Sequence, residues 1–319
     1  VGEIGATLVK EYLKQGIFTK SQGAIIFEGE KYGLHNRVFI NSLGLPTYEA
    51  KELGLAPTKY KNWPYDTSII VTGNEINEYF KVLITALKKI FPDLGKKTYH
   101  IGHGMVRLPE GKMSSRTGKI ITGESLLNEV VEKAFKVIEK TTKPTIQGQH
   151  VRYVSEATVK PSKMLSTAEK VGIASIKYAL LKNNIGRDVE FNFEESISFN
   201  GNSGPYLQYS FVRSQSVLKH ITVTNSAFRP MLTPEETVIL RQLLYFPEIV
   251  EEAALEYVPS MIATYLFDLA QKYNLFYEKC PILKAEKNVR EFRAGLVAAV
   301  AQVIKNGLWL LGIETMNEM

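Results

Sequence analysis

The spacing of hydrophobic residues divides the chain into a first part, in which strands and helices alternate, and a second part that is helical. In the first part, the amphipathic stretches 47–59 and 74–91 carry apolar residues at helical spacing and predict helices. Strands that alternate with helices of this length predict crossover connections and a parallel sheet. Short apolar runs predict the strands at 24–27, 37–40, 67–71 and 98–101.

From about residue 123 the strand pattern gives way to helical periodicity. Gly201, Gly204 and Pro205 interrupt this second part and mark a boundary near 191–205. We therefore expect an α/β domain over residues 1–190 and an all-helical domain over residues 191–319. The predicted helices are 124–140, 166–183, 206–220, 234–244, 249–256, 261–278 and 289–311.

The composition is that of an ordinary globular protein of 319 residues. Hydrophobic residues make up 45% and charged residues 23%, which argues against disorder, and the length leaves room for two cores. The single cysteine, Cys280, excludes an internal disulfide framework and every multi-cysteine zinc site, so we expect no protein-bound metal. No apolar run reaches the roughly 18 residues of a membrane span and no export signal is visible, which predicts a cytoplasmic protein without membrane contacts.

The net charge of +6 makes the chain mildly basic. The excess of lysine and arginine lies in residues 1–200, whereas residues 201–319 are close to neutral. A basic half favours a polyanionic partner, and solvated lysines that keep the protein soluble account for it equally well.

The segment 111–118, Gly-Lys-Met-Ser-Ser-Arg-Thr-Gly, has the residue types of a phosphate loop. Its flanking glycines permit movement, its hydroxyls can donate hydrogen bonds, and Lys112 and Arg116 can face phosphate groups. By residue type alone, a solvated basic turn is the simpler interpretation. The ordered string, however, resembles the KMSKS loop of class I aminoacyl-tRNA synthetases, in the variant typical of arginyl-tRNA synthetases.

This resemblance implies that the loop closes on ATP and stabilises the transition state at the α-phosphate during amino-acid activation. Lys112 and Arg116 would neutralise phosphate charge, with Met113 beside them at the nucleotide. Ser114 and Ser115 would donate hydrogen bonds. The family's usual second lysine falls on Ser115, so its charge would come from Lys112 or Arg116.

The resemblance extends along nearly the whole chain. Residues 104–106 are similar to the family's adenine-contacting segment, which implies that Met105 and Val106 bind ATP. Residues 201–209, Gly-Asn-Ser-Gly-Pro-Tyr-Leu-Gln-Tyr, resemble the stretch that enters the helical anticodon-binding domain, and 269–281 and 307–313 match later parts of that domain. The resemblance thus implies the second half of a Rossmann-type catalytic domain followed by an all-α anticodon-binding bundle. Its tRNA-binding candidates are Tyr206, Gln208, Tyr209 and Arg213, because aromatic rings stack on bases and arginine meets phosphate.

Aromatic residues at helical spacing continue beyond these candidates. Most of them are expected to be core, and so is at least one of the aromatic residues of 206–211. The later aromatic residues are Tyr265, Phe267, Tyr273, Phe276 and Tyr277.

Residues 100–103 spell His-Ile-Gly-His, the other signature of class I synthetases. A helix must follow the true signature, and Pro109 and Gly111 oppose a helix here. We therefore interpret 98–102 as a sheet strand with His103 at its carboxyl end, and the signature as coincidental. The true signature and the first half of the nucleotide fold would then lie outside this chain, which begins with Val1, and catalysis by the chain alone is not expected.

Tyr48 and Glu52 stand four residues apart on one predicted helix, where a ring and a carboxylate could hold a guanidinium group. They fall where arginyl-tRNA synthetases place the tyrosine and the acidic residue that recognise arginine, although the family usually has aspartate there. A surface helix in which Glu52 pairs with Lys51 or Lys59 is the alternative. Asn74 is a further candidate for arginine, or a helix-capping residue.

We expect an arginyl-tRNA synthetase fragment that uses ATP with Mg²⁺, arginine and the arginine-accepting tRNA, and that is a monomer. A cysteinyl enzyme is disfavoured because that family binds its substrate thiol through zinc. A catalytically inactive RNA-binding module derived from a class I synthetase remains the alternative.

Overall fold

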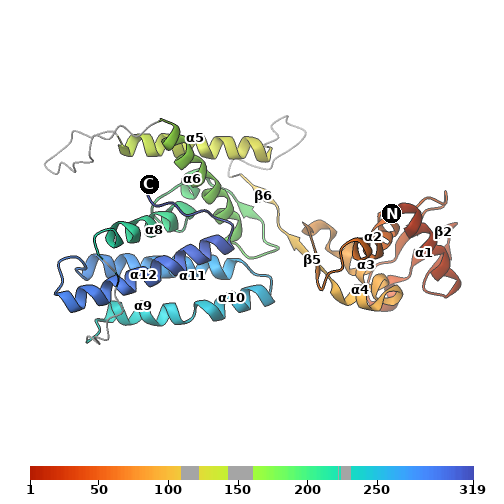
Figure 1. Cartoon of the computed structure of the whole chain (residues 1–319). Helices are drawn as coiled ribbons and strands as arrows, with labels where there is room; N and C mark the ends of the chain where they lie inside the picture. The colour runs from red at the N-terminus through yellow and green to blue at the C-terminus, as the bar shows by residue number, and fades with distance from the viewer. Residues whose placement is uncertain (109–121, 143–160, 222, 224–230) are drawn as a thin grey trace. The chain divides into compact units, whose positions relative to one another are not determined.

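The computed structural model of the chain divides into two compact units, which Figure 1 shows and which are described separately. One unit contains Val1–Met105 and Ile185–Asp188, and the other contains Val106–Asn184 and Val189–Met319. The residues that the structure describes are 1–108, 122–142, 161–221, 223 and 231–319.

The first unit combines two small sheets with helices. Its strands are β1 (Thr19–Ser21), β2 (Ala24–Phe27), β3 (Arg37–Ile40), β4 (Ser68–Gly73) and β5 (Thr98–His103). Its helices are α1 (Gly2–Lys14), η1 (Gly29–Tyr32), α2 (Tyr48–Asn62), η2 (Asn74–Ile76), α3 (Asn77–Ile90) and α4 (Pro92–Lys97).

The strands β4 and β5 pair in parallel over six residues, from Ser68 opposite Thr98 to Gly73 opposite His103. They are joined through α3 and α4, so the crossover connection predicted from the sequence is confirmed for this pair. The prediction of a parallel sheet is wrong for β1, β2 and β3, which pair antiparallel. The connections between these three strands are too short for the dozen or more residues that a parallel crossover requires.

The alternating side chains of β4 and β5 place one face of the pair against α3. On this face Ser68 and Thr98 are buried, and Ile70 packs on the core that α3 lines with Phe80 and Leu83. α3 is the strongly amphipathic helix that the sequence predicts, although its α-helical part begins at Asn77, after the short 3₁₀ turn η2.

The second unit is helical apart from a short parallel pair, β6 (Val106–Arg107) and β7 (Val189–Glu190). The helical character predicted for the later part of the chain is therefore confirmed. Its helices are α5 (Gly123–Thr142), α6 (Pro161–Leu181), α7 (Phe193–Ser196), α8 (Gly204–Leu218), α9 (Pro234–Leu244), α10 (Phe246–Leu255), α11 (Ser260–Lys279) and α12 (Lys287–Leu310).

The interruption at Gly204 and Pro205 marks the beginning of α8. The hydroxyl of Ser203 accepts a hydrogen bond from the Tyr206 backbone N–H at 3.2 Å, and Pro205 stands in the first turn, where its missing N–H is tolerated. A Cβ atom on Gly204 would lie 2.4 Å from the carbonyl oxygen of Ala174 in α6. Only glycine permits this close approach between α8 and α6.

α6 forms part of the core of the helical bundle. The ring of Tyr178 is fully buried, and its hydroxyl donates to the Ala263 carbonyl of α11 at 3.0 Å and to the Asn202 amide oxygen at 2.6 Å. α5 and α6 thus belong to the compact helical unit. Among the described residues, no helix is long and apolar enough to cross a bilayer.

Candidate functional site

The segment expected to contact the ATP phosphates, with Lys112, Met113, Ser114, Ser115 and Arg116, lies outside the described residues. The other predicted site residues fall into three groups. Two groups belong to the first unit, apart from Val106, which begins the second unit, and one group belongs to the helical unit.

The first group lies at the carboxyl ends of β4 and β5, the edge where open α/β sheets commonly bind ligands. His100 lies within β5, three residues before the end of the strand at His103. Its ring stacks on Phe80 with centroids 4.0 Å apart and an angle of 11° between the planes, and its Nε2 lies 2.7 Å from the Thr72 hydroxyl. The contacts with Phe80 and Thr72 therefore fix the imidazole within the first unit. Burial lowers the pKa of His100 below its usual value.

His103 is the last residue of β5, and its Nδ1 lies 2.8 Å from the Gly104 carbonyl oxygen. The interpretation of 98–102 as a sheet strand with His103 at its carboxyl end is confirmed. The next described element is the strand β6, so the His-Ile-Gly-His string is not followed by the helix that the synthetase signature requires.

Gly102 permits α3 to start close to the end of β5. A Cβ atom there would lie 2.0 Å from Oδ1 of Asn77, the first residue of α3. That oxygen is itself buried and has no hydrogen-bond partner among the described residues. Asn74, a predicted arginine contact, donates instead to the Gly186 carbonyl at 3.3 Å, and no side-chain hydrogen bond caps η2 or α3.

The two predicted adenine contacts stand where the chain leaves the first unit. The backbone N–H of Met105 donates to a carboxylate oxygen of Asp188 at 2.8 Å, and the Met105 side chain is half-exposed. Val106 begins β6 and pairs with Val189. The exposed Met105 side chain is compatible with a flat apolar ligand such as adenine.

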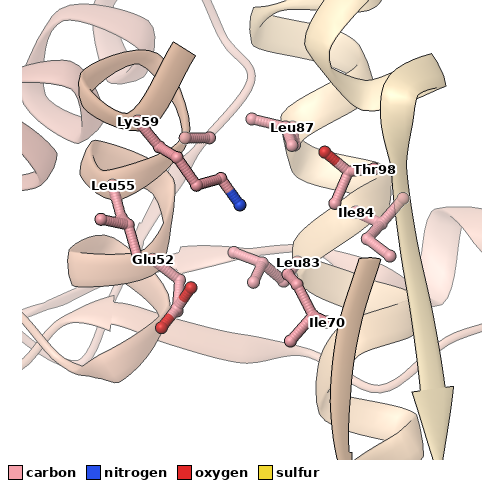
Figure 2. Close-up of a pocket in the computed structure, with 9 residues that line it drawn as sticks. Glu52, Leu55, Lys59, Ile70, Leu83, Ile84, Leu87 and Thr98 are labelled. Atoms are coloured by element: carbon pink, nitrogen blue, oxygen red, sulfur yellow. The ribbon is translucent and has the colours of Figure 1, made fainter. Parts of the chain in front are cut away.

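The second group surrounds Glu52 on α2. Figure 2 shows Glu52, Leu55 and Lys59 on one side of a pocket that Ile70, Leu83 and Leu87 complete. The cavity measures about 20 Å³, which is room for one water molecule and not for a guanidinium group. Glu52 makes no hydrogen bond or ion pair with any residue that the structure describes. Burial raises the pKa of its carboxyl, and the nearby ammonium of Lys59 acts in the opposite direction.

Tyr48 occupies the first position of α2, and its side chain is 75% exposed. Lys51 lies over its ring at 5.2 Å, and no contact joins the ring to Glu52 among the described residues. The structure therefore places both residues on α2 as predicted, but their side chains are not in contact and do not form a ready-made site for a guanidinium group. Lys59, which the sequence analysis named as an alternative partner of Glu52, instead donates to Ser68 at 2.6 Å.

Three further residues of this group were not predicted: Arg37 on β3, Glu49 on α2 and Tyr79 on α3. Arg37 lies 3.8 Å from the buried carboxylate of Glu49 and 5.8 Å from the centre of the Tyr79 ring. Burial, reinforced by the negative charges of Glu49 and Glu52, raises the pKa of Tyr79. A cation in contact with an acid and an aromatic ring is thus already present beside Glu52.

The third group is an aromatic and arginine cluster on the surface of the bundle. The guanidinium of Arg213 on α8 lies 4.8 Å from the ring centre of Tyr209 and 5.0 Å from that of Tyr277 on α11. Arg213 also donates to the Tyr209 hydroxyl at 3.1 Å. Tyr209 is 37% and Tyr277 is 40% exposed, so both rings can offer surface to a ligand. Tyr277 is one of the later aromatic residues, of which most, but not all, were expected to be core.

Asn274 of α11 holds this cluster together. Its amide nitrogen donates to the Tyr206 hydroxyl at 2.8 Å and to the Ser210 hydroxyl at 3.2 Å, and its oxygen accepts from Arg213 at 2.7 Å. Tyr206 is half-buried against Phe267, and its hydroxyl is engaged in this network. The expectation that most of the later aromatic residues are core holds for Tyr265, Tyr273 and Phe276, which are buried.

Gln208 requires a correction. Its side chain is fully buried, and its amide nitrogen donates to the Glu314 carbonyl at 2.8 Å. It lies on the inner face of α8 with Leu207 and Phe211 and offers no surface to RNA. Its role is to join α8 to the end of the chain. The burial of Phe211 confirms that at least one aromatic residue of 206–211 fills the core.

Comparison with protein families agrees with this arrangement. The family of class I tRNA synthetase (R) catalytic domains matches residues 3–193, and the DALR anticodon-binding domain matches residues 207–319. The chain belongs to the arginyl-tRNA synthetase family. The two matched regions meet between residues 193 and 207, beside the motif that opens α8.

Curated arginine–tRNA ligases match the chain along its length. The protein of Parabacteroides distasonis is 33% identical over 323 residues, and that of Porphyromonas gingivalis is 31% identical over 324 residues. Each match includes 99% of this chain but 52% of the relative, so the chain spans about half the length of these synthetases.

Solved arginyl-tRNA synthetases share the fold. The enzyme of Thermus thermophilus superposes with a TM-score of 0.79 at 24% identity, and the match includes 99% of this chain and 59% of that one. The enzyme of Plasmodium falciparum gives a TM-score of 0.77 at 19% identity, with 98% and 52% included.

Membership of the synthetase family implies the use of ATP, usually with Mg²⁺. In the part of the chain that the structure describes, no three His, Cys, Asp or Glu side chains gather as they would around a metal ion.

The buried stacking of His100 predicts a pH dependence of stability. Because its pKa is lowered in the folded state, the unfolded chain binds a proton first as the pH falls. The free energy of unfolding should be constant above about pH 6.5 and decrease below it, towards the pKa of the folded imidazole. Urea unfolding between pH 5 and 7.5, with the His100 pKa followed by NMR, tests this. In His100→Gln this component of the pH dependence should vanish, whereas His103→Gln should retain it. A His100 pKa at or above 6.5 would contradict the burial argument.

Proposed function

We propose that this chain supplies the tRNA-recognising bundle and part of the activation site of an arginine–tRNA ligase. The observation that carries the proposal is the exposed Tyr209–Arg213–Tyr277 cluster within the region matched by an anticodon-binding family. Two half-exposed rings in contact with one guanidinium offer stacking surface for splayed bases, and the cation adds attraction for phosphate. We further propose 1–190 and 191–319 as the catalytic and anticodon-binding domains.

In the proposed reaction, a carboxylate oxygen of arginine attacks the α-phosphorus of ATP, and the bond to pyrophosphate breaks. A hydroxyl of the terminal tRNA ribose then attacks the activated carbonyl, and AMP leaves. Lys112 and Arg116 would offset the negative charge on the leaving pyrophosphate, with hydrogen bonds from Ser114 and Ser115. Binding of ATP involves Met105, Val106 and Met113 in this proposal.

Arginine recognition is assigned to Glu52, with Tyr48 and Asn74. The carboxylate of Glu52 has no ionic partner among the described residues, and it lies beside the acidic and aromatic surroundings that already accommodate the guanidinium of Arg37. Because the pocket beside Glu52 is too small for a guanidinium group, substrate would approach Glu52 from the exposed end of α2, past Tyr48. We propose the chain as a monomer in solution.

Stacking on Tyr209 predicts a specific loss of RNA affinity. Tyr209→Ala should weaken binding of the arginine-accepting tRNA by about 1–3 kcal/mol, because one base loses its stacking surface. Equilibrium filter binding at fixed salt measures this. Tyr245→Ala removes a tyrosine of the bundle that is 57% exposed outside the cluster and should leave affinity unchanged. If Tyr209→Ala lowers the melting temperature while affinity per folded molecule stays intact, Tyr209 is a packing residue and the proposed interface is wrong.

Glu52 predicts the specificity for arginine. Glu52→Gln should weaken arginine binding about tenfold or more, since a hydrogen bond to a charged partner contributes about 1.5–3 kcal/mol. NMR titration of the chain with L-arginine, and with L-lysine as the ligand control, tests this. Glu78→Gln removes an exposed carboxylate of the same unit and should bind arginine normally. Equal arginine affinity in Glu52→Gln and the unmodified chain would exclude Glu52 as the recognising acid.

A further inference from the structure

One face of α6 carries a row of lysines at constant spacing. Lys163, Lys170 and Lys177 are seven residues apart, so they lie on one side of the helix, about 10.5 Å from one to the next. Such a row of ammonium groups is a regular series of point charges of the kind that phosphate groups meet in nucleic-acid-binding proteins.

The last residues of the chain lie along this row, in the opposite direction to α6. Lys177 donates to the Gly312 carbonyl, Lys170 pairs with Glu314 at 2.5 Å, and Lys163 pairs with Glu318 at 2.6 Å. Lys219, at the end of α8, also approaches Glu318 at 3.5 Å. Residues 312–319, called here the acidic tail, thus place two carboxylates against the lysines.

The acidic tail is held in place by contacts that do not involve its carboxylates. Ile313 and Met316 are buried, with Met316 packed against α5 and α6, and Gln208 donates to the Glu314 backbone carbonyl at 2.8 Å. The acidic side chains themselves are 66% exposed at Glu314 and 58% exposed at Glu318. Exposed ion pairs of this kind contribute about 0–1 kcal/mol, so the carboxylates are not required to anchor the tail.

The carboxylates nevertheless change the charge that the lysine row presents. The hydrogen bond from Lys163, followed by its positive charge, holds the pKa of Glu318 below its usual value, so this group stays ionised at neutral pH. A tethered carboxylate acts at high effective concentration and reduces the attraction of the lysines for other anions. A partner with many negative charges therefore competes with it most effectively.

We propose that the lysine row of α6, extended by Lys219, binds the phosphate backbone of RNA, and that Glu314 and Glu318 occupy the row until RNA displaces them. The inference rests on the proposed binding of tRNA. It is favoured by Lys219, because this residue directly follows the helix that carries Tyr209 and Arg213 of the proposed RNA interface. In this arrangement the acidic tail suppresses weak, sequence-independent binding of RNA. A cognate tRNA can still bind both the lysine row and the cluster around Arg213.

The test compares charge-neutral variants of the acidic tail by RNA binding. Glu314→Gln/Glu318→Gln should bind a single-stranded oligouridylate and the arginine-accepting tRNA about tenfold more tightly at low salt. The plot of log affinity against log salt should become steeper by about 2, because each additional phosphate contact adds about 0.7–0.9 to its slope. Adding Lys163→Ala/Lys170→Ala to this variant should remove the gain.

The matched control is Glu129→Gln/Glu132→Gln on α5. These glutamates form exposed ion pairs with Lys133 and Lys136, and their neutralisation changes the net charge equally. The control should alter affinity less than twofold.

An equal gain in the control, or no gain in the folded tail variant, overturns the inference. If the double variant does not fold, Glu318→Gln alone is measured against Glu132→Gln. Normal loss of tRNA binding in Tyr209→Ala without a gain in the tail variant rejects the inference and retains the proposed function. A gain on the oligouridylate without any effect of Tyr209→Ala does the reverse.

Discussion

The amide of Asn274 is the constraint on which the proposed RNA-binding surface depends. Its side chain joins α11 to α8 by three hydrogen bonds. The amide nitrogen donates to the hydroxyls of Tyr206 and Ser210, and the amide oxygen accepts from Arg213. Arg213 is therefore fixed by hydrogen bonds to protein groups and is not a free cation at the end of a flexible chain. The rings of Tyr209 and Tyr277 both contact this fixed guanidinium, so they are positioned before any ligand arrives.

The two faces of α8 have different roles. The outer face of α8 presents Tyr209, whereas its inner face buries Leu207 and Gln208 against the bundle and the end of the chain. In the first unit the comparable constraint is the close packing of Gly102 against Asn77, which places the start of α3 at the carboxyl end of β5.

Sequence patterns predicted the elements with strong periodicity or ordered motifs. The strand at 98–102, the amphipathic α3 and the helical second part follow from local spacing, and the arginyl-tRNA synthetase family follows from the ordered motifs. Motif matching could not show that Gln208 is buried and Tyr209 is exposed, because a motif carries no information on which residues face the core. Helical spacing could have done so, since Gln208 shares a buried face of the helix with Phe211, three residues further along.

Other features depend on contacts between distant segments and left no local signal. The grouping of Arg37, Glu49 and Tyr79 beside Glu52 requires β3, α2 and α3 to come together. The antiparallel pairing of β1, β2 and β3 was predictable in principle, because their short connections exclude crossovers.

We propose that the outer face of α8 and α11 contacts the tRNA anticodon. The most direct measurement is a photocrosslinking experiment with an anticodon stem-loop that carries a photoreactive base, followed by mass spectrometry of the crosslinked peptides. The account predicts crosslinks in peptides that contain Tyr209 or Tyr277. Specific crosslinks confined to other surfaces, with both of these peptides unmodified, would contradict it.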